Sequence, residues 1–294
     1  MTTTDRGHPL GERALVLGGG GSTGNAWLIG VVAGLFEAGL DVTDADLVIG
    51  TSAGSTAAAQ VTGASATDLL ADVLAAAPPP GAGARGRSAA NHLERTNAII
   101  AAARDAADMR RRIGAAALET AAASADAQTR WRATVAARLP SPHWPERTVL
   151  ITAVDAETGE PVVFDRHSGV DLVDAVAASC AGGFAYRIGG NRYVDGGYRS
   201  NADNADLAAG YARVLVLSPF GGRSRFPADW GMHLTTQVDA LRAGGSRVET
   251  VFPDGRSEHL FGANAMDPSL RPAAARAGQG RGAALAARLG ELWH

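Results

Sequence analysis

The N-terminal part of the chain alternates apolar strands with glycine-containing turns and helices, and this alternation limits the fold more than any other feature. An apolar run at residues 14–17 leads into Gly18-Gly19-Gly20-Gly21-Ser22-Thr23-Gly24 and then a helix with an apolar stripe. A second run at residues 47–49 leads into Gly50-Thr51-Ser52-Ala53-Gly54 and a second helix. Strands and helices that alternate in this way form right-handed crossovers in a parallel sheet.

The pentapeptide around Ser52 has the form G-x-S-x-G. On a sharp turn from strand to helix, such a serine is lifted out of the sheet with its hydroxyl exposed, which suits a nucleophile. Glycines on both sides allow the turn because they tolerate positive φ and leave room for close packing. The competing interpretation is that Ser52 or Thr51 only caps the helix, as such residues often do. Taken alone, the pentapeptide favours the cap.

Composition excludes several classes of protein. A chain of 294 residues with 46% hydrophobic content can bury a substantial α/β core. The net charge of −3 gives no electrostatic argument for a nucleic-acid partner. All basic side chains apart from histidine are arginine, so a P-loop lysine, a Schiff-base lysine and a Ser-Lys dyad are excluded. A single cysteine, Cys180, excludes an intrachain disulfide and a multi-cysteine zinc site.

The middle of the chain is expected to be helical, as an insert over approximately residues 81–140 of a single domain spanning residues 1–294. Residues 81–95 are rich in glycine, arginine and serine, which predicts a loop, and residues 96–139 predict two alanine-rich helices. We expect this insert to pack on the sheet rather than to bind lipid through Arg110-Arg111-Arg112, because its stripe is mostly alanine. The polar residues 1–13 and the lack of a long apolar run predict a cytoplasmic protein.

The second half of the chain predicts further strands and helices. Gly189-Gly190 is a hairpin turn signal, and the hairpin that contains it runs to Asp195-Gly196-Gly197. The other strands are expected at residues 148–154, 161–164, 213–217 and 248–252, and the helices at residues 171–178, 229–243 and 272–292.

The glycine loop allows two interpretations. Backbone N–H groups between a strand and a helix N-terminus bind anions, including the oxyanion that develops in acyl transfer. Gly19 to Gly24 also fits G-x-G-x-x-G, the dinucleotide fingerprint. That fingerprint needs an acidic residue at the end of the second strand, where this chain has Gly50-Thr51-Ser52. Nucleotide binding therefore becomes the minor alternative.

A nucleophilic Ser52 needs a general base, and the residues leave two candidates. His259 follows a predicted strand late in the chain, where the histidine of an α/β-hydrolase triad would fall. Asp195 stands in an Asp-Gly dipeptide, which by itself indicates only a turn. A buried aspartate in contact with the serine hydroxyl can nevertheless accept its proton.

Several segments together resemble the patatin-like phospholipase family. They are Leu15-Val16-Leu17-Gly18-Gly19-Gly20-Gly21-Ser22-Thr23-Gly24, Gly50-Thr51-Ser52-Ala53-Gly54, Ala178-Ser179-Cys180-Ala181 and Tyr193-Val194-Asp195-Gly196-Gly197, in that order. The resemblance implies a three-layer α/β/α fold with a mainly parallel central sheet. It also implies a serine acyl hydrolase of the phospholipase A, lysophospholipase or esterase type that needs no cofactor and no metal.

The resemblance assigns roles to particular residues. Ser52 would be the nucleophile, Asp195 the base of a Ser-Asp dyad, and Gly19, Gly20 and Gly21 the oxyanion hole. The substrate would be a lipid or another acyl ester, with peripheral contact to a membrane and no nucleic acid. Two alternatives stay open: an α/β-hydrolase triad that uses His259, and a non-catalytic or nucleotide-binding protein.

The chain departs from the family pattern at three places. Thr23 stands where the family usually has arginine or lysine, which removes a cation beside the glycine loop. Gly182-Gly183 stands where a proline is common, and Arg199-Ser200-Asn201-Ala202-Asp203 replaces the usual Asn-x-Pro. These departures bear on the substrate more than on the dyad.

Overall fold

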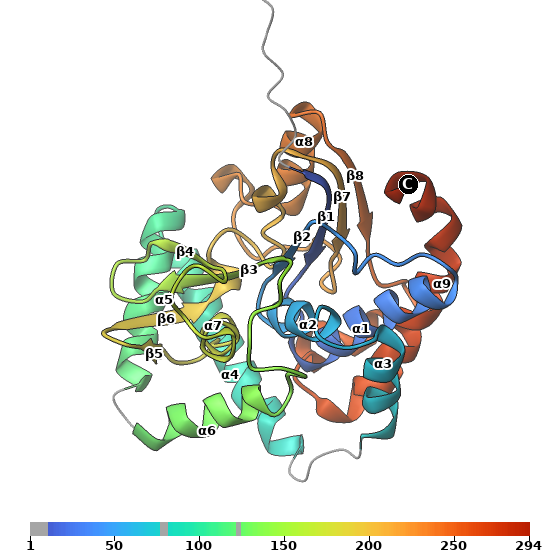
Figure 1. Cartoon of the computed structure of the whole chain (residues 1–294). Coiled ribbons are helices and arrows are strands. Elements are labelled where there is room, and N and C mark those ends of the chain that lie inside the picture. The colour runs from blue at the N-terminus through green and yellow to red at the C-terminus, as the bar shows by residue number, and fades with distance from the viewer. Residues whose placement is uncertain (1–10, 77–81, 122–124) are drawn as a thin grey trace, which may run out of the picture.

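A mixed sheet of eight strands forms the centre of the protein (Figure 1), in a computed structural model that describes residues 11–76, 82–121 and 125–294. The strands are β1 (Gly11–Leu17), β2 (Leu47–Gly50), β3 (Thr148–Asp155), β4 (Pro161–Phe164), β5 (Tyr186–Ile188), β6 (Asn191–Asp195), β7 (Tyr211–Leu217) and β8 (Arg247–Val251). Their order is β5-β6-β3-β2-β1-β7-β8, and β4 also pairs with β3. The strands from β3 through β2, β1 and β7 to β8 are parallel, whereas β4, β5 and β6 add antiparallel pairs.

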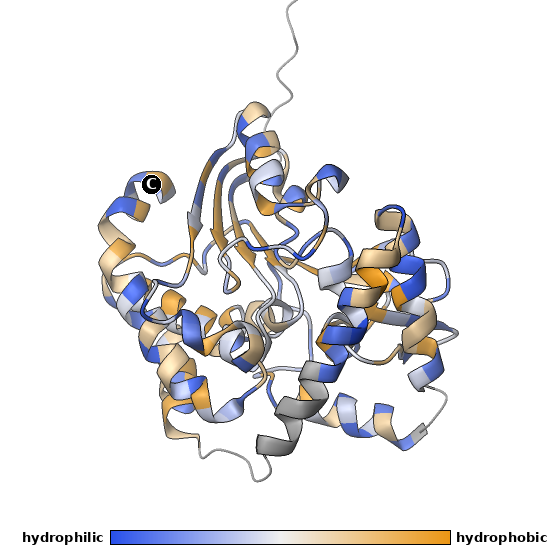
Figure 2. Ribbon diagram, turned by 180° about the vertical axis from the view of Figure 1, so that it is seen from behind, coloured by the Kyte–Doolittle hydropathy of each residue, from blue (hydrophilic) through white to orange (hydrophobic). Residues whose placement is uncertain are grey.

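The two faces of the parallel strands are both buried, which is why their sequences are continuously apolar. In β1, Leu15 and Leu17 join one core cluster, whereas Ala14 and Val16 join a second cluster on the opposite face. This alternation follows from the period of two residues along a strand. Figure 2 shows the hydrophobic residues gathered on the central strands and hydrophilic residues along the outer helix surfaces.

Helices cover both faces of the sheet. They are α1 (Gly21–Glu37), α2 (Ala53–Val61), α3 (Ala66–Ala75), α4 (Ala82–Ala102), α5 (Ala106–Ala121), α6 (Ala125–Ala136), α7 (Leu172–Ser179), α8 (Leu234–Ala243) and α9 (Arg271–Trp293). α1, α2, α3, α7 and α9 share the larger core, and α8 packs on the other face. This arrangement confirms the predicted three-layer α/β/α fold with a mainly parallel sheet.

The helices α1 and α9 lie side by side because glycines let their backbones approach closely (Figure 1). A Cβ on Gly30 of α1 would lie 2.1 Å from the carbonyl oxygen of Ala275, and one on Gly278 of α9 would lie 2.3 Å from that of Trp27. α9 is thereby fixed against the helix that begins at the glycine loop.

The helical insert differs from the sequence prediction in its details. Residues 82–102 form the helix α4, so the predicted loop over residues 81–95 is wrong for its described part, and three helices stand where two were expected. The arginines and serines taken as loop signals are tolerated in helices, and tertiary packing decides such segments. α5 packs on β3 and β6 through Met109 and Ile113.

None of the helices within residues 11–76, 82–121 and 125–294 is both long and apolar enough to cross a bilayer.

Candidate active site

Ser52 lies on a turn that needs glycine on both sides. It connects β2 to α2 with φ 53° and ψ −117°, in a region that residues with side chains rarely adopt. A Cβ on Gly54 would lie 1.8 Å from the carbonyl oxygen of Leu17, and one on Gly50 would lie 2.6 Å from Cα of Ser55. The Ser52 side chain makes no capping hydrogen bond to α2, so the interpretation of the pentapeptide as a helix cap is wrong.

The Ser52 hydroxyl instead donates a hydrogen bond to Asp195. The distance from Ser52 Oγ to Asp195 Oδ2 is 2.7 Å, although the residues are 143 positions apart in the chain. Asp195 ends β6, and β3 lies between β6 and β2 in the sheet. The other carboxylate oxygen, Oδ1, accepts the backbone N–H of Gly197 at 2.8 Å. The structure thus brings the predicted nucleophile and the predicted base into contact.

Burial changes the proton affinity of this carboxyl group. Desolvation raises the pKa of Asp195 from 3.8 to about 6, and the hydrogen bonds from Gly197 and Ser52 and the charge of Arg225 partly offset that rise. The group is therefore ionised at neutral pH but binds a proton much more readily than an exposed aspartate. A general base works best when its pKa lies near the operating pH, so the environment suits proton transfer.

The glycine loop lies directly against Ser52. A Cβ on Gly19 would be 3.5 Å from Cβ of Ser52. The Gly19 N–H already donates to the carbonyl of Ala202 at 2.7 Å, whereas the Gly20 N–H has no hydrogen-bond partner among the described residues. Gly21 begins α1, where N–H groups lack partners within the helix. Of the three predicted oxyanion donors, Gly20 and Gly21 therefore have the more available N–H groups.

The histidine predicted for a triad does not join this site. His259 is exposed on the 3₁₀ turn Glu258–Leu260, and its Nδ1 lies 3.0 Å from the carbonyl oxygen of Arg256. No contact with Ser52 or Asp195 is found for it among the described residues. The direct bond between the serine and the aspartate leaves no place for an intervening imidazole.

A different histidine, His92 of α4, faces the dyad. A Cβ on Gly182 would lie 3.8 Å from Asp195 Oδ2 and 3.9 Å from His92 Nε2, so both atoms border the same space. His92 Nε2 also lies 3.3 Å from the hydroxyl oxygen of Tyr198. Burial and the charges of Arg95 and Arg225 lower the pKa of His92, which keeps it neutral at neutral pH. The sequence offered no signal for it, because it falls in the segment predicted as a loop.

Ser179 is a second residue whose role the sequence did not reveal. Its hydroxyl oxygen accepts the backbone N–H of Ser52 at 2.9 Å and so holds the strained turn. Its neighbour Cys180 donates to the Ser52 carbonyl oxygen at 3.0 Å. Burial and the Asp195 charge raise the pKa of this thiol to about 11, so Cys180 stays protonated. Both residues belong to Ala178-Ser179-Cys180-Ala181, one of the segments that resemble the family. The sequence of this segment does not by itself indicate what it does.

A model of the patatin-like phospholipase family matches residues 15–208, well over half of the chain. The chain belongs to this family. The predicted resemblance is confirmed, and membership supports lipid acyl hydrolase activity in general. Among solved structures, VipD from Legionella pneumophila is similar at 13% sequence identity and a TM-score of 0.42, over 98% of this chain and 69% of that chain. No curated protein sequence matches the chain.

Thr23 departs from the family pattern, and a cation from another part of the chain lies close to it. Thr23 is fully buried, and its N–H donates to the carbonyl of Ala265 at 3.0 Å. The guanidinium of Arg271, at the start of α9, donates to the carbonyl of Ser22 at 2.8 Å and to Asn25 Oδ1 at 3.1 Å. The guanidinium of Arg271 therefore lies beside Thr23, the position at which the family usually has arginine or lysine.

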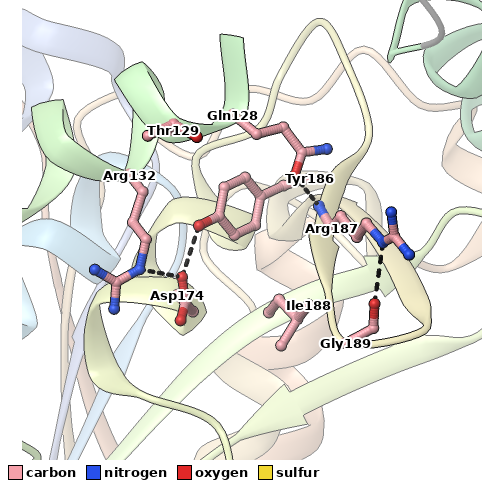
Figure 3. Close-up of a pocket in the computed structure, with 8 residues that line it drawn as sticks. All are labelled: Gln128, Thr129, Arg132, Asp174, Tyr186, Arg187, Ile188 and Gly189. Carbon is pink, nitrogen blue, oxygen red and sulfur yellow. Dashed lines mark hydrogen bonds and ion pairs between the residues drawn. The ribbon is translucent and has the colours of Figure 1, made fainter. Parts of the chain in front are cut away.

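Other polar sites are separate from the dyad. A hollow of about 290 Å³ lies between α6, α7 and the β5–β6 hairpin, and in it Arg132 and Tyr186 both point to Asp174 (Figure 3). The Arg132 Nε to Asp174 Oδ1 distance is 2.8 Å and the Tyr186 hydroxyl donates to the same oxygen at 2.6 Å, so these groups satisfy one another. No group of three or more His, Cys, Asp or Glu in the described residues is arranged to hold a metal.

Proposed function

We propose that this patatin-like protein is a serine acyl hydrolase that cleaves carboxylic esters of lipids with a Ser52–Asp195 dyad. The observation that carries the proposal is the 2.7 Å hydrogen bond from the Ser52 hydroxyl to Asp195 Oδ2. Family membership supports the hydrolase class, and the strained turn at Ser52 supports its role as nucleophile. The raised pKa of Asp195 supports its role as base.

The reaction we propose has two acyl-transfer steps. Asp195 takes the hydroxyl proton as Ser52 Oγ attacks the ester carbonyl, and the N–H groups of Gly20 and Gly21 stabilise the oxyanion of the tetrahedral intermediate. The C–O bond to the alcohol then breaks, and the alcohol leaves with the proton from Asp195. In the second step Asp195 takes a proton from water as that water attacks the acyl-serine carbonyl. Asp195 then returns the proton to Ser52 Oγ as the bond between Oγ and the acyl carbon breaks, which releases the fatty acid and free Ser52.

Contact with a lipid surface is part of this proposal, but the basic run in the insert has internal partners. Arg112 pairs with Asp108 at 3.0 Å, and Arg111 pairs with the same carboxylate at 3.9 Å. Arg110 donates to the backbone carbonyls of Gly159 and Arg199. The exposed side chain of Met266, whose Sδ adjoins Gly21 of the glycine loop, is better placed to meet acyl chains near the dyad.

The test is covalent labelling of the folded protein with a fluorophosphonate, with the modified peptide identified by mass spectrometry. We expect labelling at Ser52, which Ser52→Ala abolishes. The control Ser65→Ala should leave the labelling intact, since Ser65 is the N-cap of α3. Asp195→Asn keeps the shape of the side chain and should reduce hydrolysis of a p-nitrophenyl ester by about 10³-fold or more. If His259→Ala abolishes hydrolysis while Asp195→Asn does not, the dyad is wrong.

A further inference from the structure

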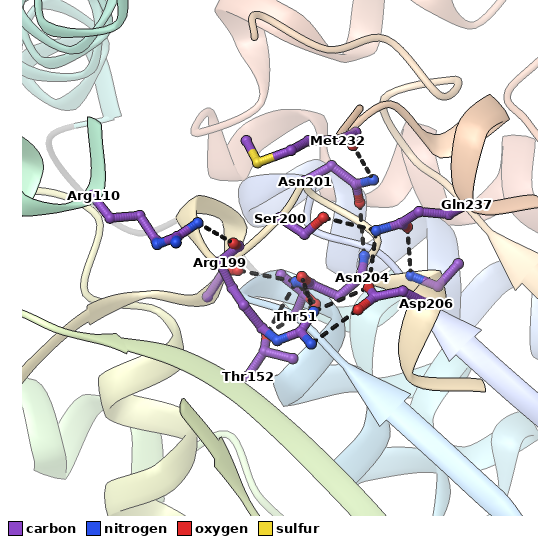
Figure 4. Close-up of polar contacts among 12 residues, drawn as sticks. Thr51, Arg110, Thr152, Arg199, Ser200, Asn201, Asn204, Asp206, Met232 and Gln237 are labelled. Carbon is purple, nitrogen blue, oxygen red and sulfur yellow. Dashed lines mark hydrogen bonds and ion pairs between the residues drawn. The ribbon is translucent and has the colours of Figure 1, made fainter. Parts of the chain in front are cut away.

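A cluster of buried polar groups connects several separate segments of the chain (Figure 4), among them the residues next to Ser52 and Asp195. Thr51 comes from the turn after β2, Thr152 from β3, Gly196 from the turn after β6, and Asn204 from the loop that follows. Thr51, Thr152 and Asn204 are each 0% exposed. Buried polar groups of this kind must satisfy one another, because an unsatisfied group costs about 1–3 kcal/mol.

The side-chain amide of Asn204 joins these segments. Its Nδ2 donates to Thr51 Oγ1 at 2.9 Å and to the carbonyl oxygen of Gly196 at 3.0 Å. A longer contact of 3.4 Å reaches Thr152 Oγ1, which itself donates to Thr51 Oγ1 at 3.0 Å. Both amide hydrogens of Asn204 are thus used on the two segments that carry the dyad.

The orientation of this amide is fixed from its other side. Arg199 Nη1 donates to Asn204 Oδ1 at 3.0 Å, so the oxygen faces the guanidinium and the nitrogen faces Thr51 and Gly196. Arg199 is itself held by Asp206, at 2.9 Å between Nη2 and Oδ2. The backbone N–H of Asn204 donates to Asn201 Oδ1 at 2.7 Å, which supports the left-handed conformation of Asn204, with φ 53°. Asparagine tolerates that conformation better than most residues.

The two ends of this bridge adjoin the reacting groups. Thr51 directly precedes Ser52, and Gly196 directly follows Asp195. The strands that carry them, β2 and β6, are not neighbours, because β3 separates them. Gly196 packs so closely on β3 that a Cβ there would lie 2.2 Å from the carbonyl oxygen of Thr152. A single amide therefore spans β3 and links the serine turn to the aspartate turn.

We infer that Asn204 is a positioning residue that sets the distance between Ser52 and Asp195 through its hydrogen bonds to Thr51 and Gly196. The inference rests on the proposed function, because it assigns Asn204 to the same dyad. A proton moves between Oγ and Oδ2 only when the atoms are within hydrogen-bond reach. A displacement of about 1 Å at such a site costs on the order of 10²-fold in rate.

The experiment measures kcat, KM and the rate of fluorophosphonate labelling for Asn204→Ala and Thr51→Val, with thermal unfolding of each variant. The control is Ser246→Ala, which also removes a buried polar group, one that donates to the carbonyl of Tyr211 rather than to the dyad turns. We expect Asn204→Ala to lower kcat and the labelling rate by about 10–100-fold with KM unchanged. Ser246→Ala should lower thermal stability with little change in either rate.

Thr51→Val keeps the shape of threonine and removes the hydroxyl that accepts from Asn204, so it serves where Asn204→Ala does not fold. Its loss in labelling rate should not add to that of Asn204→Ala in the double variant, because both break one bridge. Wild-type rates in either Asn204→Ala or Thr51→Val would overturn the inference, as would equal rate losses in these variants and Ser246→Ala. Labelling of the wild type at Ser52 tests the proposed function alone, since the inference depends on the ratio of variant to wild type.

Discussion

Asp195 should determine how hydrolysis depends on pH. The carboxyl must be ionised to accept the Ser52 proton, and its pKa is raised to about 6. We therefore expect kcat/KM to rise about tenfold per pH unit below about pH 6 and to level off near pH 7. The free-enzyme pKa governs kcat/KM, so this quantity, measured with a soluble p-nitrophenyl ester and corrected for spontaneous hydrolysis, is the one to follow.

The same shift has a cost in folding stability, and its sign can be worked out. A pKa raised from 3.8 to about 6 corresponds to about 3 kcal/mol in favour of the protonated carboxyl. Between these two values the folded protein holds a proton that the unfolded chain has released. The contribution of Asp195 to stability therefore falls as pH rises across this window and stays low above it. The pH that favours activity is not the pH at which this group favours folding.

Arg225 offers a way to move the pH profile. Its positive charge lowers the pKa of Asp195 against the larger effect of burial, and its Nη1 donates to Thr96 and Asn97 of α4. Arg225→Gln should therefore shift the inflection of kcat/KM to higher pH. Arg223→Gln is the matched control, because the Arg223 side chain forms an exposed ion pair with Glu258 at 3.8 Å. The pH profile of kcat/KM for Arg223→Gln should coincide with that of the wild type.

Two results would refute this reasoning. If kcat/KM does not change between about pH 5 and pH 7, Asp195 is not the base whose ionisation limits the reaction. If Arg225→Gln and Arg223→Gln give the same inflection as the wild type, the charge of Arg225 does not act on Asp195. A residual inflection in Asp195→Asn would assign the titration to another group.

Further predictions concern stability. Gly278→Ala should destabilise the protein by more than about 1 kcal/mol in chemical unfolding, because its Cβ would lie 2.3 Å from the carbonyl oxygen of Trp27. Gly280→Ala in the same helix is the control. It should be neutral or stabilising, because no atom lies within 4 Å of a Cβ there. Asp203 has a buried Oδ1 without a partner among the described residues, and burial raises its pKa to about 7. Wild-type stability should fall as pH rises from about 4 to 7, and Asp203→Asn should reduce that fall in urea titrations at several pH values.

Strands and turns that are marked by neighbouring residues could be predicted from the sequence. The apolar runs that became β1 and β2, the turn at Ser52 and the hairpin turn at Gly189-Gly190 all rest on neighbouring residues, and these predictions are confirmed. The segment over residues 81–95 was predicted wrongly because its composition indicates a loop while the described residues from 82 onward are helical. The single-domain assignment stays a prediction.

The candidate site was only partly predictable, for a physical reason. The choice of Asp195 over His259 came from the family resemblance, because an Asp-Gly dipeptide by itself indicates a turn. Ser179, His92 and Asn204 act through contacts with residues more than 100 positions away, and no local pattern marks such contacts. The dyad is assembled in the same way, because β2 and the antiparallel strand β6 end on opposite sides of the same stretch of β3, beside Ile151 and Ala153.

The glycine loop depends on a part of the chain that lies outside the family match at residues 15–208. Ala265 accepts the N–H of Thr23, and Arg271 donates to Ser22 and Asn25, so the residues before and within the first turn of α9 hold the start of α1. Burial lowers the pKa of Arg271 to about 10, which leaves it charged at neutral pH, and no acidic partner is found for it among the described residues. Because α9 is also fixed to α1 through close glycine contacts, a displacement of the C-terminal helix would move the N–H groups that we assign to the oxyanion. The geometry of the proposed site is therefore a property of the sheet and the C-terminal helix together.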